Sequence, residues 1–79
     1  MSGFLFRAIH AMEARHAVKE YEKAQRRDNS DGQAVAYLCA FAGEAAYHYR
    51  QAKDEANYLF WRETEERECA LAGATPIEQ

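Results

Sequence analysis

The sequence contains few residues that interrupt a helix. It has one proline and four glycines among 79 residues, and it shows almost none of the polar–apolar alternation that is typical of strands. We therefore predict an all-α protein with a single helical domain over residues 1–79. A chain of this length buries only about 60–65% of its unfolded surface, so we expect it to need very good helix packing, a cross-link or a second copy for stability.

Cysteine is also scarce. Cys39 and Cys69 are thirty residues apart and do not have a metal-ligand spacing such as C-x-x-C. We interpret them as free thiols in a reducing compartment. Residues 1–12 lack the basic start and the small-residue cleavage site of a signal peptide, and no apolar run approaches the roughly 18 residues of a membrane span. These features predict a cytoplasmic protein without a membrane partner.

Positive charge is not in excess. Ten basic residues stand against thirteen acidic ones, which gives a formal net charge of −3. Binding to a phosphate backbone requires a concentrated positive field, and Arg26-Arg27 is too small a patch to supply one. We interpret these arginines as cations that oppose the negative end of a helix. The charge balance therefore predicts no nucleic-acid partner.

No motif names a reaction, and we expect neither an enzyme nor a cofactor. The sequence has no glycine-rich phosphate loop, and its three histidines have no serine or cysteine partner in a recognised arrangement. One constellation resembles a metal site. Glu13 and His16 have the Glu-x-x-His spacing of di-iron carboxylate bundles, and Glu44 adds a third ligand. The alternative function is therefore a ferritin-like di-metal carboxylate site that a dimer assembles from Glu13, His16 and Glu44.

Helix signals mark two segments. Ser2 is suited to cap a helix over about residues 3–26, which consists of good helix formers. The turn cluster RDNSDGQ follows, and the Ser30-x-x-Gln33 capping box within it starts a second helix near residue 31. The next stop signals are Gly73 and Pro76. We predict a second helix over about residues 31–72 and a loosely held tail over 73–79.

The second helix is predicted to be continuous. Its apolar stripe keeps an unbroken alternation of three and four residues, and no Gly, Pro or Asn marks a bend near Lys53-Asp54. Gly43 lies within it, where a close backbone approach would explain a residue of low helix propensity. The stripe is expected to pack against the first helix or a second chain, and it consists of Val35, Leu38, Ala42, Ala45, Tyr49, Ala52, Ala56 and Leu59.

The expected fold is an antiparallel helical hairpin with a long second helix that dimerises into a helical bundle. The apolar residues of the first helix lie on two faces that are rotated from each other, and both are expected to pack on the alanine-rich stripe. The first face consists of Phe4, Leu5, Ala8, Ile9, Ala11 and Met12, and the second consists of Ala14, Ala17, Val18, Tyr21 and Ala24. The alternative is a three-helix bundle that bends near Lys53-Asp54 and uses the later aromatic residues as its own core.

Residues 46–61 concentrate five aromatic side chains. The first helix is roughly 35 Å long and would cover the second only to about residue 53, so the aromatic residues beyond that point need another cover. We expect a homodimer, and we predict that Tyr47, Tyr58, Phe60 and Trp61 contact a partner, which is either the second copy of the chain or another protein. The expected function is a non-enzymatic protein–protein interaction module: an adaptor, regulator or inhibitor of a larger protein or complex, of the kind that phages and mobile elements encode.

Overall fold

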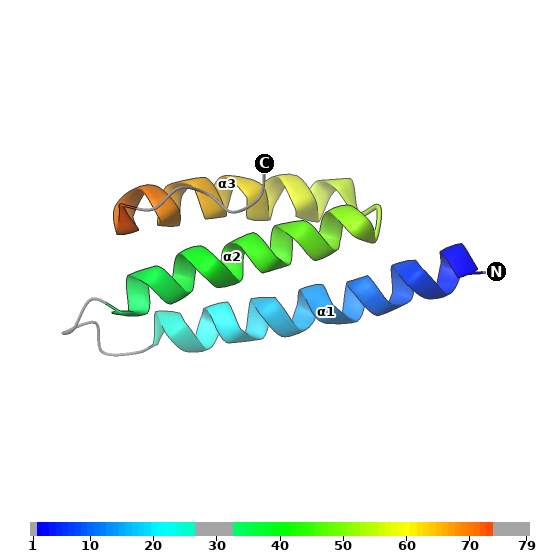
Figure 1. Cartoon of the computed structure of the whole chain (residues 1–79), viewed down its shortest axis with the longest axis horizontal. Coiled ribbons are helices and arrows are strands. Elements are labelled where there is room, and N and C mark those ends of the chain that lie inside the picture. Colours follow the sequence, from blue (N-terminus) through cyan, green and yellow to red (C-terminus); the bar gives the residue numbers. More distant parts are fainter. Residues whose placement is uncertain (1, 27–32, 74–79) are drawn as a thin grey trace.

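The computed structural model describes residues 2–26 and 33–73, which form three helices. These are α1 (Ser2–Gln25), α2 (Gln33–Gln51) and α3 (Glu55–Ala72). The described residues contain no strand, so the all-α prediction is confirmed. Figure 1 shows α2 between α1 and α3, with neighbouring helices running in opposite directions. The predicted capping box at Ser30 and most of the predicted tail lie outside the described residues.

The prediction of a continuous second helix is wrong. α2 ends at Gln51, and residues 52–54 reverse the chain so that α3 packs antiparallel to α2. Lys53 has a φ of 64°, in the left-handed region that residues other than glycine seldom adopt. Asp54 then caps α3, because its carboxylate accepts hydrogen bonds from the backbone N–H of Asn57 at 3.3 Å and from the Asn57 amide at 2.8 Å. The three-helix alternative is consistent with this arrangement.

α2 presents small side chains to both of its neighbours. Ala42, Ala45 and Ala46 have no exposed surface, and short side chains allow close helix packing. α1 and α3 each pack against α2, whereas no Cα atom of α1 lies within 8 Å of one in α3 among the described residues. α1 and α3 meet through side chains instead. The Tyr21 and Trp61 rings form an edge-to-face contact with their centroids 5.0 Å apart.

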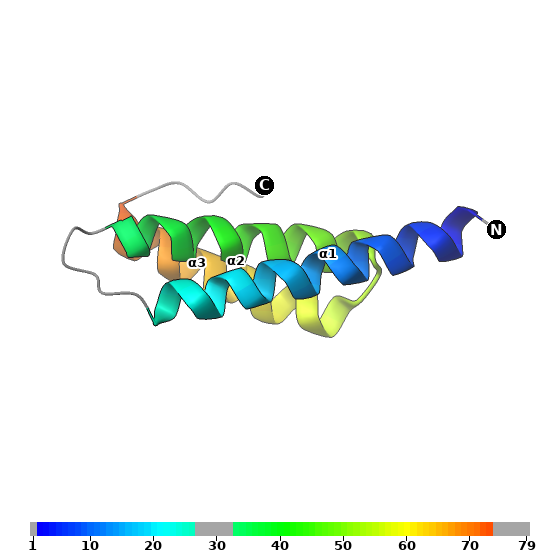
Figure 2. The ribbon, with the colours of Figure 1, turned by 90° about the horizontal axis from the view of Figure 1, so that it is seen from below.

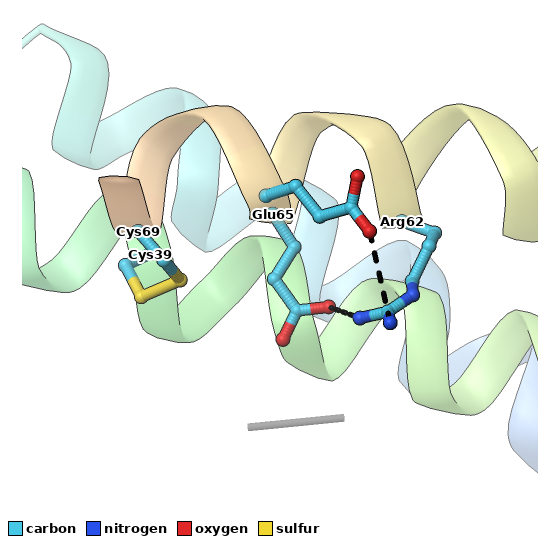
Figure 3. A network of polar contacts seen from close by, with 5 residues as sticks. Cys39, Arg62, Glu65 and Cys69 are labelled. Carbon is cyan, nitrogen blue, oxygen red and sulfur yellow. Dashed lines mark hydrogen bonds and ion pairs between the residues drawn. A yellow bond between two sulfur atoms is a disulfide. The ribbon is translucent and has the colours of Figure 1, made fainter. Parts of the chain in front are cut away.

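The contact between α2 and α3 includes a buried charge. Glu65 of α3 has no exposed surface, and its Oε1 accepts a hydrogen bond from Nη1 of Arg62 at 3.3 Å (Figure 3). A Cβ atom at Gly43 of α2 would lie only 2.7 Å from Oε2 of Glu65. Gly43 therefore leaves room for a carboxylate of the neighbouring helix, whereas we expected it to accommodate a neighbouring backbone.

Cys39 of α2 and Cys69 of α3 form a disulfide, so the interpretation of two free thiols is wrong (Figure 3). Both cysteines are buried, and their Cα atoms are 4.6 Å apart. The bond ties the ends of α2 and α3 that lie away from the turn at residues 52–54. Disulfides are rare in reducing compartments. The cytoplasmic location therefore stays a prediction, and the disulfide does not support it.

Removal of the disulfide should destabilise the fold. A cross-link that closes a loop of this length restricts the unfolded chain by roughly 3–4 kcal/mol in the chain-entropy model. We expect the double variant Cys39→Ala/Cys69→Ala to lose about that much free energy of unfolding in urea denaturation followed by circular dichroism. Chemical reduction of the wild-type protein is the matched comparison. Equal stability of the oxidised and reduced proteins would contradict a stabilising cross-link.

The space beside Gly43 gives a second prediction. We expect Gly43→Ala to lower the free energy of unfolding by roughly 1–2 kcal/mol. Glu65 is fully buried and paired with Arg62, so it cannot move aside freely, and the overpacking cost exceeds the gain of about 1 kcal/mol in helix propensity. In a Glu65→Ala background the added methyl group has room, and the same change should stabilise by up to about 1 kcal/mol. Urea denaturation of the four proteins measures the difference. The same sign in both backgrounds would show that Glu65 does not occupy this space.

Candidate interaction surface

Small and polar side chains fill the core, and many large apolar side chains lie on the surface. Most of the buried hydrophobic residues are alanines, and the buried set also includes Thr64, Glu65 and Glu68. Tyr21 and Trp61 are its large aromatic members. Closed monomers bury such large residues and seldom expose them in clusters. Among the residues that the structure describes, the large apolar side chains that are at least 40% exposed are Phe4, Leu5, Phe6, Ile9, Met12, Tyr37, Tyr47, Leu59, Phe60 and Leu71.

Exposed apolar residues are concentrated in the first half of α1. Phe4, Leu5, Ile9 and Met12 are each more than half exposed, and α1 extends past the turn between α2 and α3 at this end (Figures 1 and 2). The expectation that this face packs on α2 is wrong. The second expected face of α1 is the buried one, since Ala14, Ala17, Tyr21 and Ala24 are buried and Val18 is partly buried.

The four aromatic residues predicted to contact a partner are divided between surface and core. Phe60 is 59% exposed and Tyr47 is 47% exposed. Tyr58 is partly buried against the core, and Trp61 is only 8% exposed. The expectation that Trp61 lies beyond the reach of the first helix is wrong, because the bend at residues 52–54 folds the indole back against α1. Tyr47 and Phe60 are the members of this set that another protein could contact most fully.

The predicted packing stripe follows the core only as far as the bend. Ala42 and Ala45 are buried, whereas Ala56 and Leu59 are exposed. The remaining members, Val35, Leu38, Tyr49 and Ala52, are partly buried. Because the chain reverses at residues 52–54, the residues of α3 that face the core do not continue the spacing of the predicted stripe. They are Trp61, Thr64, Glu65, Glu68 and Cys69. Contact of Ala56 and Leu59 with a second chain stays a prediction.

Two histidines that the sequence did not connect meet between α1 and α2. Nδ1 of His10 lies 2.8 Å from Nδ1 of His48, so one ring donates a hydrogen bond to the other. Burial lowers the pKa of His48, and the neighbouring His10 lowers it further, whereas Glu13 and Glu44 act in the opposite direction. This hydrogen bond between the two imidazoles links α1 to α2 beside the exposed apolar face of α1.

A single chain does not assemble the predicted metal ligands. Among residues 2–26 and 33–73, no group of three or more His, Cys, Asp or Glu side chains is placed to hold a metal ion. Glu13 and Glu44 are exposed. His16 is also exposed, and it lies 3.9 Å from Glu20 on its own helix. The di-metal alternative would therefore need a second chain, and it stays a prediction.

Tyr21 provides a polar link between α1 and α3. Its hydroxyl donates a hydrogen bond to Oε2 of Glu68 at 2.7 Å. Burial raises the pKa of Tyr21 to about 12, the Glu68 carboxylate contributes to this rise, and Arg67 opposes it. The hydroxyl therefore keeps its proton over a wide pH range and satisfies a carboxylate that is almost completely buried.

This chain matches no protein-family model, no curated protein and no solved structure in the comparisons made. None of the helices in the part of the chain that the structure describes is long and apolar enough to cross a membrane. The exposed apolar side chains are therefore the feature of the described structure that bears most directly on function.

The buried tyrosine predicts a loss of stability at high pH. An unperturbed tyrosine has a pKa of about 10, so the unfolded state loses this proton before the folded state does. The contribution to stability is fully present below about pH 10 and is lost as the pH rises towards 12. We expect urea denaturation to show this decline, and we expect Tyr21→Phe to reduce it. Tyr47→Phe, at an exposed position, is the matched control and should retain the wild-type decline. An identical decline in Tyr21→Phe would contradict this assignment.

Proposed function

We propose that this protein is a non-enzymatic helical module that binds other proteins, and that one of its partners is a second copy of itself. The observation that supports this most strongly is the distribution of apolar side chains. Phe4, Leu5, Ile9 and Met12 are more than half exposed, although alanines occupy the core. Burial of apolar surface contributes about 25 cal/mol per Å². Association with another chain would bury the apolar surface that the three helices leave exposed, and this burial would stabilise the complex.

The aromatic surface supports a second binding role. Tyr47 of α2 and Phe60 of α3 are about half exposed, and large aromatic side chains contribute strongly at protein interfaces. Phe60 also forms an edge-to-face contact with the buried Trp61, with ring centroids 5.2 Å apart, so the core holds it in place. A protein that self-associates and still presents ordered aromatic residues is suited to act as an adaptor, regulator or inhibitor of a larger protein.

Self-association is the part of this proposal that can be tested directly. We expect sedimentation velocity at micromolar concentrations to show species of at least twice the mass of one chain, in increasing proportion as concentration rises. Higher salt, which screens charge pairs, should not abolish them, because apolar contacts supply much of the association. Circular dichroism on the same samples checks that the helices are intact. A monomer with full helical content at every concentration would contradict self-association.

A further inference from the structure

Two exposed stripes, one on α1 and one on α3, have matching spacing. The outer α1 stripe consists of Leu5, Ile9, Met12, His16, Lys19 and Lys23, all of which are exposed. The outer α3 stripe consists of Ala56, Leu59, Glu63, Glu66 and Ala70, which are also all exposed. In both stripes the intervals alternate between three and four residues. This alternation is the pattern of a seam between two helices that coil around each other.

Both stripes change from apolar to charged along the helix, and their charges have opposite signs. The outer α1 stripe is apolar up to Met12 and continues with His16 and the two lysines. The outer α3 stripe is apolar up to Leu59, continues with the two glutamates and ends at Ala70. Met12, His16 and Lys19 line one shallow hollow of the surface together with Arg15. The change from apolar to basic therefore occurs on one continuous face of α1.

We propose that the outer α1 stripe of one chain packs in parallel against the outer α3 stripe of a second copy. This inference rests on the proposed self-association and names its interface. When Met12 is set opposite Leu59, the intervals of three and four residues coincide on both helices and every layer stays in register. The layers are Ile9 with Ala56, Met12 with Leu59, His16 with Glu63, Lys19 with Glu66, and Lys23 with Ala70.

Charge favours this pairing over pairing of identical stripes. Two parallel α1 stripes would set Lys19 opposite its own copy, and two parallel α3 stripes would do the same with Glu66. A full antiparallel overlap would set the charged half of a stripe against the apolar half. Ion pairs within each helix compete only in part with the proposed ion pairs between chains. Lys23 lies 3.4 Å from Glu20 and Glu66 lies 3.7 Å from Arg62, yet the side chains of Lys23 and Glu66 stay 64% and 56% exposed.

The fold permits this pairing without rearrangement. α1 and α3 flank α2 and run in the same direction (Figure 1). A second copy in the same orientation can therefore place its α1 alongside the α3 of the first. Because the contact joins two different surfaces, each pair of chains keeps one free stripe at either end. Assembly then proceeds head to tail beyond the dimer unless a ring closes, which differs from the two-fold dimer expected from the sequence.

Two single substitutions separate the two sides of the interface. Met12→Asp alters only the α1 stripe, and Leu59→Asp alters only the α3 stripe. Both positions are more than half exposed, so the helices should form normally, as circular dichroism would verify. Each variant alone lacks one of the two surfaces. We expect each to be monomeric where the wild-type protein associates, with a loss of affinity of roughly tenfold or more.

A mixture of the two variants gives the deciding result. The Leu59→Asp chain keeps its α1 stripe and the Met12→Asp chain keeps its α3 stripe, so the mixture should form a one-to-one dimer that does not grow. Leu71→Asp is the matched control, because Leu71 is 72% exposed on α3 but lies outside the stripe. This variant should associate as the wild-type protein does. Sedimentation velocity measures all five samples.

The other outcomes separate this inference from the proposed function. Variants that are monomeric alone and also monomeric when mixed would overturn the pairing of α1 with α3 and would favour an interface of identical surfaces. Variants that associate as strongly as the wild-type protein would place the interface elsewhere, and would overturn the inference while self-association stands. A wild-type protein that stays monomeric at every concentration would overturn both.

Discussion

α2 packs against two helices at once, and its small side chains determine how closely both can approach. Ala42, Gly43 and Ala46 allow the neighbouring helices close to the α2 backbone, but they supply little apolar volume to the core. Other contacts must therefore hold the helices together. The disulfide joins α2 to α3, and the aromatic contact between Tyr21 and Trp61 joins α1 to α3 where their backbones stay apart.

The buried carboxylates of α3 specify which of its faces lies inside. An unpaired buried carboxylate is costly, and each one here has a specific partner. Glu65 pairs with Arg62 beside Gly43, and Glu68 accepts the hydroxyl of Tyr21. A rotation of α3 about its axis would break the hydrogen bond between Tyr21 and Glu68 and would move Glu65 away from Gly43. The same rotation would be needed to bury Leu59, so the polar contacts inside keep apolar side chains on the surface.

Much of the helical structure could be predicted from the sequence, because its signals are local. The first helix consists of strong helix formers, and Gly73 caps the C-terminal end of α3. Its φ of 71° suits glycine, and its N–H donates a hydrogen bond to the carbonyl of Ala70. The bend was missed because Lys53 adopts a left-handed conformation without being glycine or asparagine. A local signal was nevertheless present, since Asp54 precedes Glu55 and Asn57 in the pattern of a helix N-terminus.

The contacts across the bend had a signal in the sequence as well. Residues that pack opposite each other in an antiparallel helix pair are about equally distant from the turn between them. Cys39 and Cys69 are equally distant from Asp54, and so are Gly43 and Glu65. A charge and a glycine at such positions indicate a buried pair only when the bend is known. Packing depends on the fold of the whole chain, and therefore the disulfide, the buried Glu65 and the outward face of α1 could not be read from helix periodicity alone.

The bend also determines how the chain can meet other proteins. In a two-helix hairpin the helices would be antiparallel, and a second copy in the same orientation could offer only antiparallel contacts across its outer faces. The second reversal, at residues 52–54, returns α3 to the direction of α1. It also moves Trp61 into the core and leaves Leu59 and Phe60 exposed. The parallel course of α1 and α3 sets the basic half of one outer stripe at the same end of the molecule as the acidic half of the other, and this polarity allows identical chains to complement each other.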